Sequence, residues 1–120
     1  MKYPYDIRIF RSSGRNWLEF TFPQEARILS DFLFSDIGSS PSFYLKPINR
    51  VLTNESEREL VLGDVCGLEV YKETTMIYSS IAENCDTNAC EIPTIELKQL
   101  IEEWVAETQK FQQGHQCEIF

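Results

Sequence analysis

The chain has 120 residues, of which 42% are hydrophobic, and it carries a formal net charge of −8. This length predicts one domain spanning 1–120, large enough to bury a core without metal ions or disulfides. The net charge arises entirely in residues 61–120, because acidic and basic side chains balance in residues 1–60. An acidic surface disfavours nucleic acids and anionic membranes, which are recognised through basic residues.

The composition also indicates where the protein works. No apolar run approaches the roughly 20 residues that a membrane span needs, and the N-terminus has no signal-peptide core. We therefore expect a cytoplasmic protein. In that compartment the four cysteines favour reduced thiols over disulfides; they are Cys66, Cys85, Cys90 and Cys117.

The N-terminal residues predict a β-hairpin. Residues 3–10 alternate apolar and polar side chains, with Tyr5, Ile7 and Ile9 on one side, which is typical of a half-buried strand. Residues 17–22 alternate in the same way. The link between the two runs is rich in Ser, Gly and Asn, which favours a turn.

Two further segments complete the first half. Apolar residues at helical spacing predict a helix over 24–36, which begins after Pro23. Residues 42–52 then have extended character. We expect Pro47 to interrupt this segment at a sheet edge or a bulge, because proline has no amide hydrogen for a central strand.

The second half predicts four short strands and a long helix. The strands are expected at 59–62, 66–72, 75–81 and 90–92. The helix is expected over about 95–112, with Thr94 as its N-cap and Gly114 after its end. Its apolar stripe consists of Leu97, Leu100, Ile101, Trp104, Val105 and Phe111. Together the elements predict an α+β domain, with about five or six mostly antiparallel strands and two main helices packed on the sheet.

The cysteines leave one metal-binding alternative open. Cys85 and Cys90 bound a short loop, and His115 and Cys117 lie close together near the C-terminus. These side chains are zinc ligands in many proteins. The simpler interpretation is that the first two thiols only flank a loop, and we predict neither a metal nor a cofactor.

The sequence contains no pattern typical of an enzyme. His115 is the only histidine and lies in a polar stretch, where no nucleophile is expected beside it. The glycines Gly63 and Gly67 are not followed by the Lys-Ser/Thr of a phosphate-binding loop. We therefore predict that the protein is not an enzyme.

Carboxylates gather in the later strands and their loops, and they form the predicted partner-binding patch. Its members are Asp64, Glu69, Glu73, Glu83, Asp86 and Glu91, with Glu96, Glu102, Glu103 and Glu107 nearby on the helix. Such charge either keeps the protein soluble or attracts a basic partner. A protein interface also needs aromatic anchors, for which the candidates are Trp17, Phe43, Tyr44, Tyr71 and Tyr78.

Residues 63–111 resemble bacterial immunity proteins that accompany polymorphic and contact-dependent growth-inhibition toxins. The similar features are a Cys-Gly strand, a short hairpin, an acidic loop, a Pro-Thr helix start and a Leu-Ile-Glu-Glu-Trp helix. The resemblance implies a cytosolic, non-catalytic protein that binds the C-terminal domain of one toxin, often a basic nuclease, in a 1:1 complex. A protein–protein adaptor or scaffold subunit is the alternative.

Overall fold

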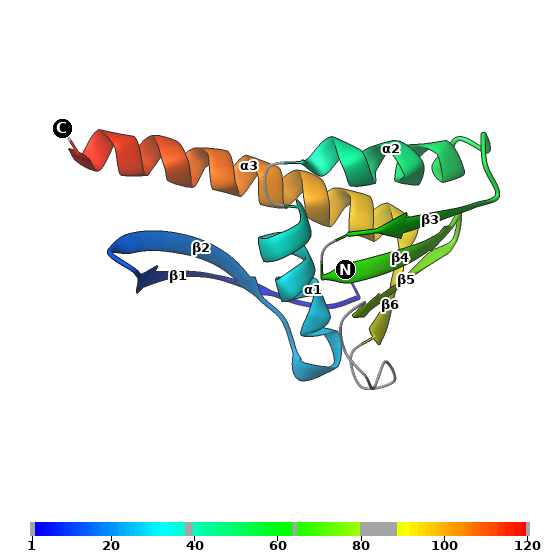
Figure 1. Ribbon diagram of the computed structural model, residues 1–120, viewed down its shortest axis with the longest axis horizontal. Helices are drawn as coiled ribbons and strands as arrows, with labels where there is room; N and C mark the ends of the chain where they lie inside the picture. The colour runs from blue at the N-terminus through cyan, green and yellow to red at the C-terminus, as the bar shows by residue number, and fades with distance from the viewer. Residues whose placement is uncertain (1, 38–39, 64, 80–88, 120) are drawn as a thin grey trace.

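The computed structural model describes residues 2–37, 40–63, 65–79 and 89–119, with side chains as far as Phe111. The fold is α+β, as predicted (Figure 1). Its elements are β1 (Asp6–Ser12), β2 (Arg15–Thr21), η1 (Gln24–Ala26), α1 (Ile28–Asp31), η2 (Phe32–Ile37), α2 (Pro41–Leu52), β3 (Arg58–Leu62), β4 (Cys66–Tyr71), β5 (Thr74–Ser79), β6 (Ala89–Pro93) and α3 (Thr94–Ile119).

The described strands form two antiparallel sheets. β1 and β2 pair only with each other, whereas β3, β4, β5 and β6 form a four-stranded sheet in that order. All six strands were predicted close to their observed positions. Their division between two sheets was not, because local alternation does not say which strands pair across the chain.

Helices α2 and α3 lie on one face of the four-stranded sheet (Figure 1). Alternate strand residues point toward these helices and are buried, because successive side chains of a strand point to opposite faces. This buried face consists of Val61, Cys66, Leu68, Val70, Thr75, Ile77, Cys90 and Ile92. It packs against Leu97, Leu100, Ile101 and Trp104, which confirms most of the predicted stripe of α3.

The helix predicted over 24–36 is present as three consecutive helical segments. η1 is a 3-10 turn, α1 is a short α-helix and η2 is a π-helix. The buried residues of η2 are Phe32, Leu33 and Ile37. The wider π turn directs Phe32 and Ile37, five residues apart, toward the same core.

The extended segment predicted over 42–52 is wrong, because these residues belong to α2. Pro41 occupies the first turn, where proline is tolerated, and Pro47 lies inside the helix. The buried residues Tyr44, Pro47, Ile48 and Val51 follow helical spacing. Burial of this stripe outweighs the hydrogen bond that Pro47 cannot donate.

α3 differs from its prediction at both ends. Thr94, the predicted N-cap, is instead the first helical residue, where it is buried and its hydroxyl donates to the Tyr71 carbonyl. At the other end the helix continues through Gly114 to Ile119. A glycine inside a helix costs only about 1 kcal/mol relative to alanine, so the helix propensity of the surrounding residues can offset this cost.

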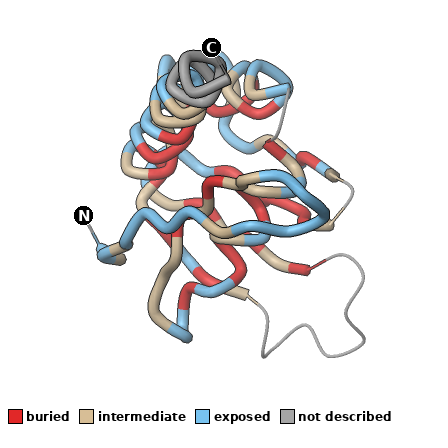
Figure 2. The backbone as a smooth tube through the Cα atoms, turned by 90° about the vertical axis from the view of Figure 1, so that its left-hand side faces the viewer, coloured by how far each residue is buried: buried red, intermediate tan, exposed pale blue. Residues whose placement is uncertain are grey.

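The hairpin β1–β2 is mostly exposed, as the pale blue tube of Figure 2 shows. Ile7 and Ile9 are 45% and 59% exposed, so the half-buried strand predicted at 3–10 is wrong at these positions. The hairpin is fixed to the core through β2, whose Leu18 and Phe20 are buried, and at its base. There the Tyr5 ring stacks on Phe20 at 4.7 Å, and burial together with the nearby Glu103 of α3 raises the pKa of the Tyr5 phenol.

Candidate functional site

The second face of the four-stranded sheet is covered by no described helix, and we call it the open face. The strand registers place its side chains in rows across the sheet. One row runs from Leu60 through Glu69 and Met76 to Glu91. The open face consists of Arg58, Leu60, Leu62, Gly67, Glu69, Tyr71, Thr74, Met76, Tyr78, Ala89, Glu91 and Pro93.

Apolar side chains form the floor of the open face. Leu60 and Leu62 are 58% and 67% exposed, and Met76 and Tyr78 are partly exposed. Beside them, Gly67 faces Tyr78 across the β4–β5 pair. A Cβ at Gly67 would lie 2.5 Å from the Tyr78 ring, so glycine allows this ring to lie flat across β4.

A charged cluster occupies the β3–β4 side of the open face. The Tyr71 hydroxyl donates to Glu69 Oε1, and Arg58 Nη2 lies 3.3 Å from the same oxygen. The hydrogen bond from Tyr71 lowers the pKa of the Glu69 carboxyl, and the charge of Arg58 acts in the same direction. Glu69 is therefore ionised at neutral pH and held in one orientation.

Three of the six predicted patch residues lie in the described part of the chain. Glu69 and Glu91 share one row of the open face, separated by β5, which places their backbones about 10 Å apart. Glu73 is exposed in the turn between β4 and β5. Asp64, Glu83 and Asp86 lie outside the described residues.

Buried hydrogen bonds hold the turn that carries Glu73. The Thr94 amide donates to the Glu73 carbonyl at 3.2 Å, and the Thr94 hydroxyl donates to the Tyr71 carbonyl. The Thr75 hydroxyl lies 2.8 Å from that of Thr94. Because Thr75 and Thr94 are buried, the start of α3 fixes the turn at the end of the open face.

The aromatic candidates divide into two groups. Tyr71, 38% exposed, and Tyr78 lie on the open face. Trp17 packs against Phe34, Tyr44 is buried, and Phe43 is 55% exposed on α2. Sequence reasoning missed Arg58, Leu60, Leu62 and Met76 as site residues. The signal for the two leucines was present, since an apolar residue on both faces of a short strand indicates a second contact surface.

The described residues do not assemble a metal site. No group of three potential ligands is found among them. Cys90 and Cys66 are buried free thiols, and burial raises the pKa of Cys90 to about 11 and that of Cys66 to about 12. Cys85 and the side chains of His115 and Cys117 lie outside the described residues.

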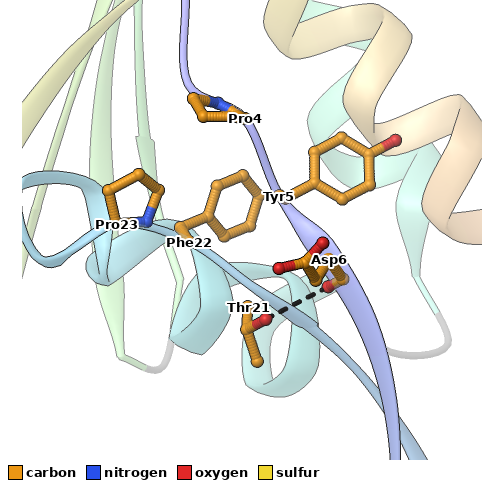
Figure 3. Close-up of a pocket in the computed structure, with 6 residues that line it drawn as sticks. All are labelled: Pro4, Tyr5, Asp6, Thr21, Phe22 and Pro23. Carbon is orange, nitrogen blue, oxygen red and sulfur yellow. Dashed lines mark hydrogen bonds between the residues drawn. The ribbon is translucent and has the colours of Figure 1, made fainter.

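A cavity of about 330 Å³ lies at the base of the hairpin (Figure 3). It is lined by Pro4, Tyr5, Asp6, Thr21, Phe22 and Pro23, and the Thr21 hydroxyl donates to the Asp6 carbonyl at 3.2 Å. Figure 3 shows the Tyr5 side chain directed toward α3 and the Phe22 side chain on the other side of the N-terminal segment that carries Pro4, Tyr5 and Asp6. Asp6 is the only ionisable carboxylate of this lining, so its residues do not form an acid–base pair.

The comparison with known proteins decides the family. The chain is 34% identical over 119 residues to a protein of Bacillus cereus described as an immunity protein, and the match covers 99% of both chains. This chain belongs to the family of bacterial immunity proteins. No family model and no solved structure matches it. None of the described helices has the length and apolar character of a membrane span.

Proposed function

We propose that this immunity protein neutralises the C-terminal domain of a toxin from a polymorphic or contact-dependent growth-inhibition system. The target is a basic nuclease domain, bound in the cytoplasm in a 1:1 complex. The immunity protein acts by occupying the substrate groove of the toxin and has no enzymatic activity. The family membership supports a toxin partner, and the net charge of −8 supports a basic one.

The arrangement of side chains on the open face is the observation that most supports this proposal. Glu69 and Glu91 lie on either side of the exposed Met76 in one row, and Leu60 extends that row to the sheet edge. Carboxylates so placed can pair with the Lys and Arg side chains with which a nuclease holds phosphates. The apolar side chains between them exclude water and slow dissociation.

The charge distribution supports fast association. Residues 61–120 carry the whole net charge of −8, and they include β4, β5 and β6. A concentrated field of one sign raises the rate of encounter with an oppositely charged protein by roughly 10- to 1,000-fold at low salt. We expect the association rate to fall at least tenfold between about 50 and 500 mM salt.

Growth rescue tests the function. The toxin domain encoded immediately upstream of this chain is expressed with and without the immunity protein, and the complex is purified. We expect restored growth and a 1:1 complex. The charge reversals Glu69→Lys and Glu91→Lys, combined, should lower affinity at least tenfold, because both positions face the partner.

The matched control is Glu102→Lys, which reverses an exposed charge on α3, on the other side of the sheet. It should bind within about twofold of wild type. Continued toxicity with the wild-type protein would contradict the proposal and favour the adaptor alternative. Equal losses for Glu102→Lys and for either single reversal, Glu69→Lys or Glu91→Lys, would show that net charge acts without an interface on the open face.

A further inference from the structure

The two edges of the four-stranded sheet differ. At the β6 edge, the N-terminal residues lie alongside the strand, and the Glu91 carbonyl accepts hydrogen bonds from Lys2 Nζ at 3.1 Å and from the Tyr3 hydroxyl at 2.9 Å. At the β3 edge, β4 pairs with one side of Leu60–Leu62, and no other described segment hydrogen-bonds to their backbone. Half of the backbone groups of an edge strand point away from the sheet and are available to another chain.

The β3 edge is charged only at its start, at Arg58 and Glu59. Edge strands are commonly blocked by charged side chains, proline or a bulge. Here the last three residues of β3 are Leu60, Val61 and Leu62, and the two leucines are 58% and 67% exposed. An apolar edge of this kind in a folded protein indicates a surface that another segment covers.

A groove runs beside this edge, with α2 as its other wall. It encloses about 510 Å³ and is lined by Ser40, Ser42, Phe43, Lys46, Pro47, Arg50, Glu59, Leu60, Val61 and Leu62. Phe43 is 55% exposed in the wall. The groove therefore offers apolar side chains on both sides of a free strand edge.

The charge of the groove is opposite to that of the whole chain. Arg50 Nη2 pairs with Glu59 Oε1 at 2.8 Å, so these two charges cancel. Lys46 has no ion-pair partner among the described residues, which leaves the groove with one net positive charge. A carboxylate on a segment that fills the groove would form an ion pair with Lys46.

The open face is too small to hold a partner alone. Four strands of about five residues measure roughly 15 by 17 Å, or about 250 Å² in projection. A stable protein–protein interface buries about 800 Å² on each partner. Leu60 and Leu62 belong both to the open face and to the groove, so one partner can continue from the face around the β3 edge.

We propose that the toxin places an extended segment in this groove as a fifth strand beside β3. Its alternate side chains on the open-face side are apolar and lie beside Leu60 and Leu62. The intervening side chains face α2 and include an apolar residue against Phe43 and a carboxylate opposite Lys46. Its backbone hydrogen-bonds to the free edge of β3, a mode of binding that recurs in peptide recognition. This inference rests on the proposed toxin-neutralising function and assigns a second, chemically different part of the same interface.

The test compares substitutions in the groove with matched substitutions elsewhere, using the toxin domain encoded upstream as the probe. Leu60→Lys and Lys46→Glu are each expected to weaken binding at least tenfold. The control for Leu60→Lys is Ile9→Lys on the hairpin, because Ile9 is 59% exposed and Leu60 is 58% exposed. The control for Lys46→Glu is Lys110→Glu on α3. Both controls should stay within twofold of wild type.

Amide hydrogen exchange gives a second readout that does not depend on folding of the variants. In the wild-type complex, outward-facing amides of residues 60–62 should exchange at least tenfold more slowly than in the free protein. If the wild-type protein binds and rescues growth, but neither groove variant weakens binding and these amides are not protected, the inference is overturned while the proposed function stands.

Two other outcomes also count against a toxin segment in the groove. If the wild-type protein binds no toxin, the proposed function fails and the inference fails with it. If the free protein sediments as a dimer that Leu60→Lys converts to a monomer, a second copy of this chain occupies the edge instead.

Discussion

The two sheets are built from the same kind of strand but differ in how much of each is buried. In the four-stranded sheet, Leu68 and Ile77 are fully buried beneath the helices. In the hairpin, Leu18 and Phe20 of β2 are buried, whereas Ile9 and Ile7, which pair with them from β1, remain about half exposed. The hairpin carries Arg8, Arg11 and Arg15 beside Asp6 and Glu19, whereas the open face carries Glu69 and Glu91 beside Arg58.

The difference shows that alternation identifies a strand but not the depth of its burial. A strand buries its apolar side only where a helix reaches it. α2 and α3 cover the four-stranded sheet, whereas helical segments reach mainly β2 of the hairpin. The Phe20 ring lies 5.1 Å from that of Trp104 in α3, and the Trp17 ring lies 5.8 Å from that of Phe34 in η2. The substitutions below test this contrast between the two sheets.

Truncating one isoleucine in each sheet should give the largest difference in stability between the two sheets. Ile77→Ala removes a fully buried side chain from β5 and should lower the free energy of unfolding by about 2–5 kcal/mol, because it leaves a cavity. Ile9→Ala in the hairpin should change it by no more than about 0.5 kcal/mol. Urea unfolding of both variants measures the difference. Equal losses would mean that the hairpin is packed as tightly as the sheet.

Glycines give the next contrast. Gly67→Ala in β4 should cost about 1–3 kcal/mol, because the new Cβ displaces the Tyr78 ring. Gly14→Ala in the hairpin turn meets no atom within 4 Å but has φ +76°, so it should cost about 1 kcal/mol from backbone strain. In a Tyr78→Ala background only the cost of Gly67→Ala should disappear. An unchanged cost there would contradict the contact between Gly67 and Tyr78.

The buried thiols both belong to the four-stranded sheet, so the pH dependence that they cause tests this sheet and not the hairpin. The unfolded chain ionises near its ordinary thiol pKa of about 8.5, whereas burial raises the pKa of Cys90 to about 11 and that of Cys66 to about 12. Because the unfolded state releases protons first, stability present below about pH 8.5 is lost as the pH rises toward 11–12.

We expect a loss of about 2 kcal/mol per thiol between pH 8 and pH 10, measured by urea unfolding at each pH. The Cys66→Ala/Cys90→Ala variant should be less stable than wild type at pH 8, but its stability should depend less on pH over this range. The same slope in wild type and variant would show that other groups cause the pH dependence.

Ion pairs should give the smallest effects on stability. Arg8 pairs with Glu19 on the hairpin at 2.9 Å, and Arg58 pairs with Glu69 on the open face at 3.3 Å. Both pairs are solvent-exposed, so Arg8→Ala and Arg58→Ala should each leave the urea midpoint of unfolding almost unchanged. Their effects on binding should differ, because Arg58→Ala removes a cation beside Glu69. We expect Arg58→Ala to associate with the toxin several-fold faster than Arg8→Ala, as measured by stopped-flow mixing.

Much of the fold was predictable because its elements have strong local patterns. The hairpin, the four later strands and α3 each show alternation or helical spacing over enough residues to be recognised. α2 was missed because Pro47 was given more weight than the stripe of Tyr44, Ile48 and Val51. Local patterns also did not predict the separation of the two sheets, which depends on pairing between distant segments.

The candidate site was only partly predictable. The sequence indicated that Glu69 and Glu91 are acidic strand residues, but their common row follows from the registers of three strand pairs. The exposed Leu60 and Leu62 depend on β3 being a sheet edge, which is a property of the assembled sheet. Cationic side chains beside the groove, such as Lys46, come from α2, which was expected to be extended.

The most direct test of the open face is carboxylate labelling of the free protein and of its toxin complex, followed by mass spectrometry. The account predicts that Glu69, Glu73 and Glu91 lose most of their reactivity in the complex. Asp6 on the hairpin and Glu102 on α3, both exposed, should react equally in both states. Protection of Asp6 or Glu102, with Glu69 and Glu91 unchanged, would contradict the assignment of the open face as the toxin-binding surface.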